Sequence, residues 1–241
     1  MKNKKLKATL SITGYLLLLI ALCIAAVFVF HSTYYELIYV SGSSMYPTLN
    51  GSDEEANGTV VDFGIVDTHK SAIEHVKRFD IVSTYYPDDY DAQGKLSINA
   101  KKKIKRVIGM PGDTFTIKDG LLSVKKGDEY INIPYNFKVV ETTVKDINDK
   151  ELGEDEYWLL GDNRANSNDC GKIGKPVLKK QIAGVLVAIE GSAKLKIKNY
   201  RCNQCGKTFS TRYKSCDKCG GWTFTEQYDL VNKNYCWPKY Y

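Results

Sequence analysis

The first 30 residues have a hydrophobic pattern that differs from the rest of the chain. Residues 8–30 are 23 consecutive residues without a charged side chain. As an α-helix they extend about 35 Å, which is enough to cross the ~30 Å hydrocarbon layer of a bilayer with some tilt. Residues 1–7 carry four lysines, whereas residues 31–40 carry only Glu36 as a full charge. This asymmetry predicts a single-pass anchor in the cell membrane, with residues 1–7 cytoplasmic and the remaining chain extracellular.

A cleaved signal peptide is the alternative for this segment, because it also begins with basic residues and an apolar stretch. The apolar region of a signal peptide usually has only ~7–15 residues. The greater length of residues 8–30 favours an anchor that stays attached.

After residue 38 the apolar residues occur in short runs that are typical of strands. Such runs are rich in Val, Ile, Tyr and Thr, are bounded by Gly, Asp or Pro, and occupy residues 59–66, 80–86, 115–117, 157–160 and 182–189. No long stretch has helical periodicity. The pattern predicts a mainly β protein with an antiparallel β domain over residues 36–195, followed by a separate cysteine-bearing tail at residues 200–241.

Composition narrows the possible partners. The 241 residues carry a formal net charge of +6 and are 43% apolar, which is sufficient for one substantial domain with a buried core and a small appendage. The basic clusters lack the interleaved pattern of a nucleic-acid groove, so we expect no nucleic acid as a partner. The lipid bilayer is the expected partner of the anchor and of its basic flank.

Three polar segments contain groups suited to catalysis, although each also has an ordinary structural explanation. Residues 41–48 form a Ser/Gly/Pro loop, residues 105–113 place a lysine before an apolar strand, and residues 161–169 form a loop rich in turn residues. An unperturbed lysine is neutral in roughly one molecule in 2,500 at pH 7. Burial that lowers its pKa by ~3 units would make it a useful general base.

In this order and spacing, the three segments resemble the type I signal peptidases. These are membrane-bound Ser/Lys proteases that remove signal peptides from exported proteins, and the chain looks most like their Gram-positive branch. The resemblance covers most of residues 8–190 and implies that Ser44 is the nucleophile and Lys105 its general base. It also implies that exported preproteins are the substrates and that catalysis needs no cofactor.

The resemblance assigns supporting roles to three further residues. Ser167 matches the position whose hydroxyl orients the lysine, and Asp169 matches a carboxylate that supports the site. Gly42 matches the residue that holds the oxyanion together with the amide of the nucleophile, but glycine offers no hydroxyl. The substrate is expected as an added strand beside residues 102–105, with an Ala-x-Ala preference before the cleaved bond.

The chain departs from the usual pattern of this family in two places. Cys170 and Gly171 stand where many members have Ser-Arg, which removes an ion pair expected for Asp169. Lys172 is the nearest candidate to replace it. Phe79 stands where glycine usually precedes the strand that begins at Asp80.

The seven cysteines include two Cys-x-x-Cys-Gly turns near the C-terminus, formed by Cys202, Cys205, Cys216 and Cys219. Two such turns offer the four thiolates that tetrahedral zinc requires. The sequence therefore predicts a zinc ribbon with a structural zinc ion, in which Cys170 and Cys236 take no part. A pair of disulfides is the alternative, since an extracellular location permits them. The partner of such a ribbon is unknown.

Two other functions remain open from the sequence. A membrane-tethered adaptor would use the ribbon to bind a partner and would have lost catalysis. A self-cleaving Ser/Lys protease would share the dyad, but proteases of that kind are soluble and have no anchor. The presence of both Ser44 and Lys105 favours an active peptidase.

Overall fold

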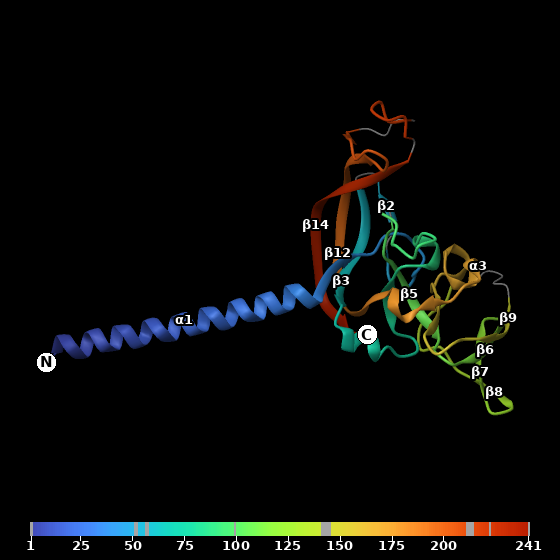
Figure 1. Cartoon of the computed structure of the whole chain (residues 1–241), viewed down its shortest axis with the longest axis horizontal. Helices are drawn as coiled ribbons and strands as arrows, with labels where there is room; N and C mark the ends of the chain where they lie inside the picture. Colours follow the sequence, from blue (N-terminus) through green and yellow to red (C-terminus); the bar gives the residue numbers. More distant parts are fainter. Residues whose placement is uncertain are drawn as a thin grey trace. The chain divides into compact units, whose positions relative to one another are not determined.

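The computed structural model describes residues 2–50, 53–55, 58–98, 100–140, 146–210, 215–221 and 223–240. The chain divides into two compact units, Met1–Glu36 and Leu37–Tyr241. The first unit is a helix, and the second consists mostly of antiparallel strands (Figure 1). The mainly β fold predicted from the sequence is therefore confirmed.

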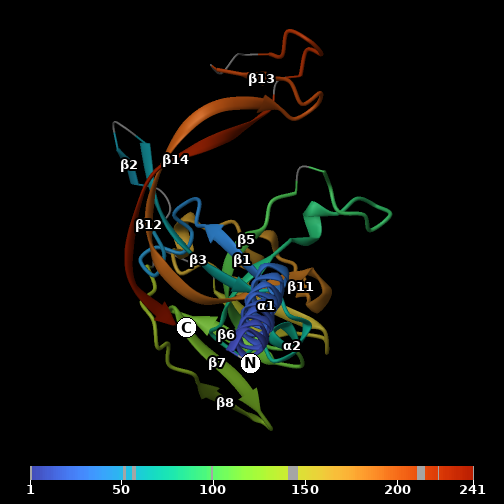
Figure 2. The same cartoon turned by 90° about the vertical axis from the view of Figure 1, so that its left-hand side faces the viewer.

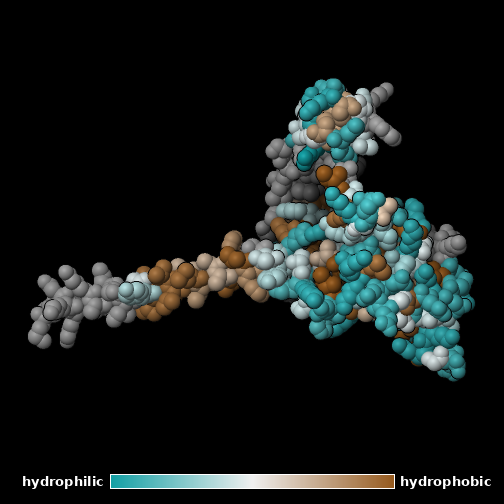
Figure 3. All heavy atoms as spheres, viewed as in Figure 1, coloured by the Kyte–Doolittle hydropathy of each residue, from teal (hydrophilic) through white to brown (hydrophobic). Residues whose placement is uncertain are grey.

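Helix α1 (Lys2–Tyr34) contains the predicted anchor. Its segment Thr13–Phe30 is long and apolar enough to cross a membrane, and it is the one such helix in the described part of the chain. These 18 residues extend about 27 Å. Large apolar side chains such as Leu17 and Phe28 are more than two thirds exposed. In Figure 3 the described part of the helix is mostly brown, the colour of hydrophobic residues. Helix α1 fits a single-pass membrane anchor.

The larger sheet positions the candidate catalytic residues. Its strand order is β1-β3-β12-β4-β5-β10-β11, and the pairings from β3 to β11 are antiparallel. The strands are β1 (Tyr35–Tyr39), β3 (Gly58–Asp67), β12 (Ile182–Cys202), β4 (Ile81–Thr84), β5 (Lys103–Gly109), β10 (Glu156–Leu160) and β11 (Val177–Leu178).

Strand β12 continues well beyond this sheet. Its first residues pair with β4, its middle with β3, and most of its length with β14 (Phe224–Tyr240), so that β3, β12 and β14 lie side by side (Figure 2). Two short strands extend the same sheet, β2 (Asp53–Glu55) beside β3 and β13 (Thr208–Phe209) beside β12. Pairing thus runs without interruption through residues 195–200. The division into domains at 36–195 and 200–241 stays a prediction.

A smaller sheet has the order β8-β7-β6-β9. Its strands are β6 (Thr114–Lys118), β7 (Leu121–Lys126), β8 (Glu129–Asn132) and β9 (Ile147–Glu151). The helical elements after α1 are short, namely α2 (Lys70–Glu74), α3 (Cys170–Ile173), η1 (Pro87–Asp89), η2 (Arg164–Asn166) and η3 (Lys179–Gln181).

Two clusters of buried apolar side chains lie on either side of β5. The larger cluster includes Val107, Phe115 and Leu159. The smaller cluster includes Met45, Leu49, Ile81 and Leu186, and Ile104 packs against it. Since neighbouring residues of a strand point to opposite faces, Ile104 and Val107 attach β5 to both clusters. Burial of such side chains contributes roughly 1.5–3 kcal/mol each and makes β5 a rigid support.

Candidate active site

Ser44 lies in a turn that follows β1. The turn is closed by a hydrogen bond from the Tyr46 amide to the Ser43 carbonyl, 3.1 Å. Met45 and Leu49 are buried in the smaller apolar cluster, whereas Ser44 is only half-buried. The apolar neighbours therefore fix the turn while the hydroxyl of Ser44 stays accessible.

Lys105 lies in β5, opposite Val82 of β4. The residue is 4% exposed. Its Nζ donates hydrogen bonds to Ser44 Oγ at 2.7 Å and to the carbonyl oxygen of Ile104 at 2.9 Å. The structure thus brings together the two side chains that the sequence predicts as nucleophile and base.

Burial changes the protonation of Lys105. The pKa of Lys105 is lowered to about 8, chiefly because burial removes the ammonium group from water. The carboxylate of Asp169 opposes this shift, and the nearby charge of Lys103 adds to it. With a pKa of about 8, roughly one Lys105 side chain in ten is neutral at pH 7. The desolvation that the sequence argument required is therefore present in the fold.

The loop after β10 holds the Ser44 turn in place. Gly161 packs so closely that a Cβ atom would overlap the Ser44 carbonyl oxygen, so only glycine fits at this position. The Asn163 amide donates to the same carbonyl at 3.0 Å, and its side chain donates to the Ser43 carbonyl at 3.1 Å. Asn166 donates to Ser43 Oγ at 2.8 Å. These contacts fix the position of Ser44 from the side opposite the apolar cluster.

Ser167 and Asp169 lie behind this loop, and both are buried. The Asp169 carboxylate accepts one hydrogen bond from the Gly161 amide at 2.8 Å and one from the Gly171 amide at 3.0 Å. Asp169 therefore supports the site by holding Gly161. The Ser167 hydroxyl also adjoins Gly161, and it has no hydrogen-bond partner among the described residues. Its proposed role in orienting Lys105 stays a prediction.

The replacement of Ser-Arg by Cys170 and Gly171 has a structural explanation. Cys170 is fully buried and accepts a hydrogen bond from the Leu159 amide at 3.3 Å, and burial raises the pKa of its thiol to about 12. It is a neutral core residue. Lys172 is exposed, and no ion pair joins it to Asp169 in the part of the chain that the structure describes. Two backbone amides satisfy that carboxylate instead.

Gly42, the proposed oxyanion residue, has φ of +84°. This left-handed conformation favours glycine over residues with a side chain. It explains why a glycine is tolerated at this position, although its part in holding an oxyanion stays a prediction.

Arg106 and Asp162 lie within the segments 105–113 and 161–169, but the sequence pattern indicates no role for either. Arg106 donates to both oxygens of Asp162, Nε at 2.8 Å and Nη2 at 2.6 Å, and both side chains are almost completely buried. Thr48 donates to the same carboxylate at 2.5 Å. This network joins the Ser44 turn, β5 and the loop after β10. The signals in the sequence were a charged residue directly before an apolar run, Arg106 beside Lys105, and a charged residue soon after one, Asp162 beside Gly161.

Phe79 adopts the conformation that the usual glycine would take at this position. Its φ is +76°, which is strained for a residue with a side chain and costs ~1–3 kcal/mol. Its ring packs edge-on against Tyr135 and Phe137, with centroids 5.8 and 5.3 Å away. Its carbonyl accepts a hydrogen bond from Arg106 at 2.8 Å. Aromatic packing offsets the strain and adds a further contact to the Arg106 network.

One edge of β5 is open beside the dyad. Strand β4 pairs with residues 103–106 of β5, whereas β10 pairs only with Arg106, Val107 and Gly109 on the other side. No strand in the described part of the chain pairs with the β10 side of residues 103–105. An extended peptide can therefore add to the sheet next to Lys105.

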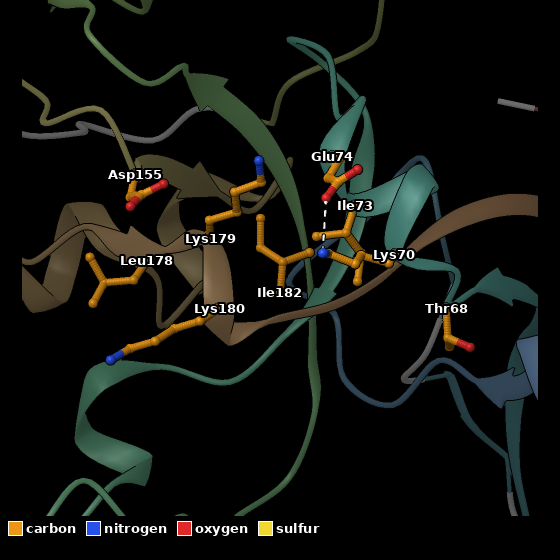
Figure 4. A pocket seen from close by; sticks show the side chains of 9 residues that line it. All are labelled: Thr68, Lys70, Ile73, Glu74, Asp155, Leu178, Lys179, Lys180 and Ile182. Atoms are coloured by element: carbon orange, nitrogen blue, oxygen red, sulfur yellow. Dashed lines mark ion pairs between the residues drawn. The ribbon is translucent and has the colours of Figure 1, made fainter.

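Two well-formed cavities lie away from the dyad. One, of about 570 Å³, lies between α2 and the η3 turn, where Lys70 and Glu74 form an exposed ion pair of 3.5 Å across its rim (Figure 4). The other, of about 480 Å³, shares Leu178 and Lys180 with it. Neither of these two cavities is lined by Ser44 or Lys105.

The four tail cysteines converge in one cluster. All four Sγ atoms lie within 4.8 Å of one another, with Cys202 and Cys219 3.6 Å apart and Cys205 and Cys216 also 3.6 Å apart. Both turns have the same form, because the amides of Gly206 and Gly220 bond to the carbonyls of the first cysteine in each turn at 2.9 and 2.8 Å.

This geometry suits a metal with four thiolate ligands. Tetrahedral zinc with Zn–S bonds of ~2.3 Å separates its sulfur atoms by about 3.8 Å. A disulfide would need sulfur atoms only ~2.05 Å apart. Hydrogen bonds from backbone amides, that of Cys205 first, lower the pKa of the Cys202 thiol to about 7, whereas burial and the neighbouring cysteines raise the pKa of the Cys219 thiol to about 12. The distances between the sulfur atoms therefore carry the argument for a metal site. Cys236, which we expected to take no part, has a side chain that lies outside the described residues.

The Arg106–Asp162 pair generates a prediction about stability. Arg106→Met should lower the free energy of unfolding by about 3–5 kcal/mol, because it leaves the buried Asp162 carboxylate without its cation. Lys175→Met is the matched control, since Lys175 and Asp88 form an ion pair whose side chains are both 63% exposed, and it should cost less than about 1 kcal/mol. Denaturant unfolding of the full chain in detergent measures both. Equal losses in the two variants would contradict the importance of the buried pair.

Comparison with known proteins agrees with this architecture. The family model "Signal peptidase, peptidase S26" matches residues 12–189, about three quarters of the chain. Signal peptidase I V of Bacillus subtilis (strain 168) is 30% identical over 156 residues, which is 61% of this chain and 80% of that protein. Signal peptidase I S of the same strain is 33% identical over 156 residues, with 60% and 71% covered.

A solved structure of a signal peptidase I from Enterococcus faecalis V583 is 25% identical, covers 46% of this chain and 96% of that one, and gives a TM-score of 0.35. The family match ends before the cysteine cluster. The chain belongs to the signal peptidase family, peptidase S26, and is a membrane-bound serine peptidase of the signal peptidase I type that cleaves signal peptides.

Proposed function

We propose that Ser44 and Lys105 are the catalytic dyad with which this peptidase cleaves N-terminal signal peptides from exported preproteins. The observation that carries the proposal is the 2.7 Å contact between Lys105 Nζ and Ser44 Oγ, made by a buried lysine whose pKa is lowered to about 8. No other base is needed, because the neutral amine can accept the hydroxyl proton directly.

The reaction follows from this geometry. Neutral Lys105 takes the proton of Ser44 as Oγ attacks the peptide carbonyl carbon. Backbone amides near Ser44 and Gly42 stabilise the oxyanion of the tetrahedral intermediate. When the C–N bond breaks, Lys105 returns the proton to the leaving amine and an ester remains on Ser44. Water, deprotonated by Lys105, then hydrolyses this acyl-enzyme and restores the free hydroxyl.

The open edge of β5 supports binding of the substrate as an added strand beside residues 102–105. A peptide that pairs there brings its carbonyl next to Ser44, and apolar Ile104 and Met45 adjoin the same position. Small apolar side chains before the cleaved bond, as in Ala-x-Ala, fit this surface. The anchor orientation that agrees with the basic residues 1–7 has the N-terminus in the cytoplasm and the catalytic unit outside.

Substitution of the dyad tests the proposal. Ser44→Ala and Lys105→Met should each abolish cleavage of a model preprotein in detergent, with a loss nearly as large as in the double variant, because the two side chains act as one unit. Membrane insertion should stay normal in both. Lys126→Met, an exposed lysine of β7, is the control and should keep full activity. Full cleavage by either dyad variant would exclude the dyad, and no turnover by the wild type would favour the inactive adaptor.

The pH dependence tests the role of Lys105 separately. Since the neutral amine is the active form, kcat/KM should rise with pH and level off above about 8, the pKa that burial gives Lys105. Lys105→Arg should be inactive at every pH, because guanidinium stays charged. A rate that falls steadily from pH 6 to pH 9, with circular dichroism unchanged, would contradict Lys105 as the base.

We also propose that Cys202, Cys205, Cys216 and Cys219 hold one structural zinc ion. The convergence of the four sulfur atoms and the matched glycine turns support this assignment. The exposed pair of Lys207 and Asp217, 2.8 Å apart, links the two turns from outside. So small a module rarely folds without a metal or cross-links, so zinc would supply its folding free energy.

Metal analysis tests the zinc site. Protein purified without reducing agent should contain about one zinc ion per chain, and Cys205→Ser should lose it, whereas Cys236→Ser should retain it. Chelation should make residues 201–221 more sensitive to protease and leave peptidase activity unchanged, since the dyad uses no metal. Absence of zinc together with four oxidised thiols would show that the cysteines form disulfides.

A further inference from the structure

Strand β5 presents two lysines on the face that carries the catalytic amine. Lys103 and Lys105 are two residues apart, so their side chains share one face of the strand, whereas Ile104 points to the other face and packs against the smaller apolar cluster. Lys105 has a role in the proposed mechanism, as the general base of the dyad. Lys103 affects that mechanism only through its charge, which helps to lower the pKa of Lys105, and it lies about 7 Å away along the strand.

Lys103 is held in place by residues of the segment after β4. Its Nζ donates to Asp89 Oδ2 at 2.6 Å and lies 5.1 Å from the centre of the Tyr86 ring. The same oxygen of Asp89 accepts the Tyr86 amide at 2.7 Å, which fixes the carboxylate. The side chain of Lys103 is 29% exposed and that of Asp89 is 17% exposed. A cation is thus fixed on the face of β5 that also carries Lys105, and it remains partly accessible.

The next step rests on the proposed function, in which a substrate strand occupies that edge. Side chains of the added strand also alternate between the two faces, and neighbouring strands lie ~4.8 Å apart. The small apolar side chains of Ala-x-Ala belong on the Ile104 face, because apolar Met45 and Ile104 lie there. The middle residue, at position −2 from the cleaved bond, then lies on the face of Lys103.

We propose that Lys103, held by Asp89, forms a cationic subsite for the substrate side chain at position −2. An acidic or hydrogen-bond-accepting side chain there gains an interaction with the ammonium group. A lysine or arginine is repelled by Lys103, and Asp89 offsets this repulsion only in part because its carboxylate is already bound to Lys103 and to the Tyr86 amide. The subsite therefore gives this peptidase a preference at the residue between the two small positions.

Paired substrates test the subsite. A model preprotein is prepared with Ala-Glu-Ala, Ala-Gln-Ala or Ala-Lys-Ala before the cleaved bond, and kcat/KM is measured for full-length protein in detergent. The wild type should favour glutamate over lysine about fivefold, the effect of one partly exposed ion pair. The ratio of kcat/KM for the Ala-Glu-Ala substrate to that for the Ala-Lys-Ala substrate should fall close to one in Lys103→Met. In Lys103→Glu it should fall below one. Asp89→Asn should increase it, since asparagine keeps an acceptor for the Tyr86 amide but loses the competing charge.

Lys126→Met is the matched control, because it removes one positive charge from an exposed position on the smaller sheet and should leave the ratio unchanged. A wild-type ratio of one would overturn the proposal, and so would a ratio that Lys103→Met does not alter. If Ser44→Ala cleaves the Ala-Gln-Ala substrate as fast as the wild type, the dyad fails. If Ser44→Ala is inactive but substitution of Lys103 does not change the glutamate-to-lysine ratio, the dyad stands and only the proposed subsite is excluded.

Discussion

The active site depends on keeping the amine of Lys105 out of water without pairing it with a carboxylate. Burial lowers its pKa, whereas a carboxylate in direct contact would raise it again. Two acidic side chains are close, and each is occupied elsewhere. Asp162 is bound by Arg106, and Asp169 accepts two backbone amides. The remaining hydrogen bonds of Lys105 go to a hydroxyl and a carbonyl, which leave the neutral form accessible near pH 8.

The same arrangement explains why three distant segments must assemble before the dyad forms. Arg106 follows Lys105 in β5 and points to the opposite face, so the residue that binds Asp162 is positioned by the strand that positions the base. Thr48 joins this network from the turn of Ser44. Loss of the Arg106–Asp162 pair would therefore disturb nucleophile, base and supporting loop together. Such coupling is the reason to expect a large effect from a residue that contacts no substrate.

Local patterns in the sequence predicted the anchor and most strands, because strands and turn residues have a short-range signal. Ser44 and Lys105 were assigned through the resemblance to a known family, since their own segments are also typical of ordinary loops and strands. They did not predict the ion pair of Arg106 and Asp162, since a contact between residues 56 apart depends on tertiary packing. The left-handed Phe79 was visible only as a departure from a family pattern, and its compensation by Tyr135 and Phe137 required the fold. The sequence offered Lys172 as a candidate partner for Asp169, but it could not show that two adjacent backbone amides satisfy this carboxylate.

Strand β12 determines how far the cysteine cluster can influence the dyad. It pairs with β4, the neighbour of β5, only through residues 182–185, and it reaches Cys202 after a further 17 residues. At ~3.3 Å per residue this is about 55 Å of strand. Between these points β12 is held by β3 and β14. Local unfolding that starts at the cysteine end of β12 therefore has to break many hydrogen bonds between strands before it reaches the residues that pair with β4. A metal at that end can stabilise the tail while the geometry of Ser44 and Lys105 remains independent of it.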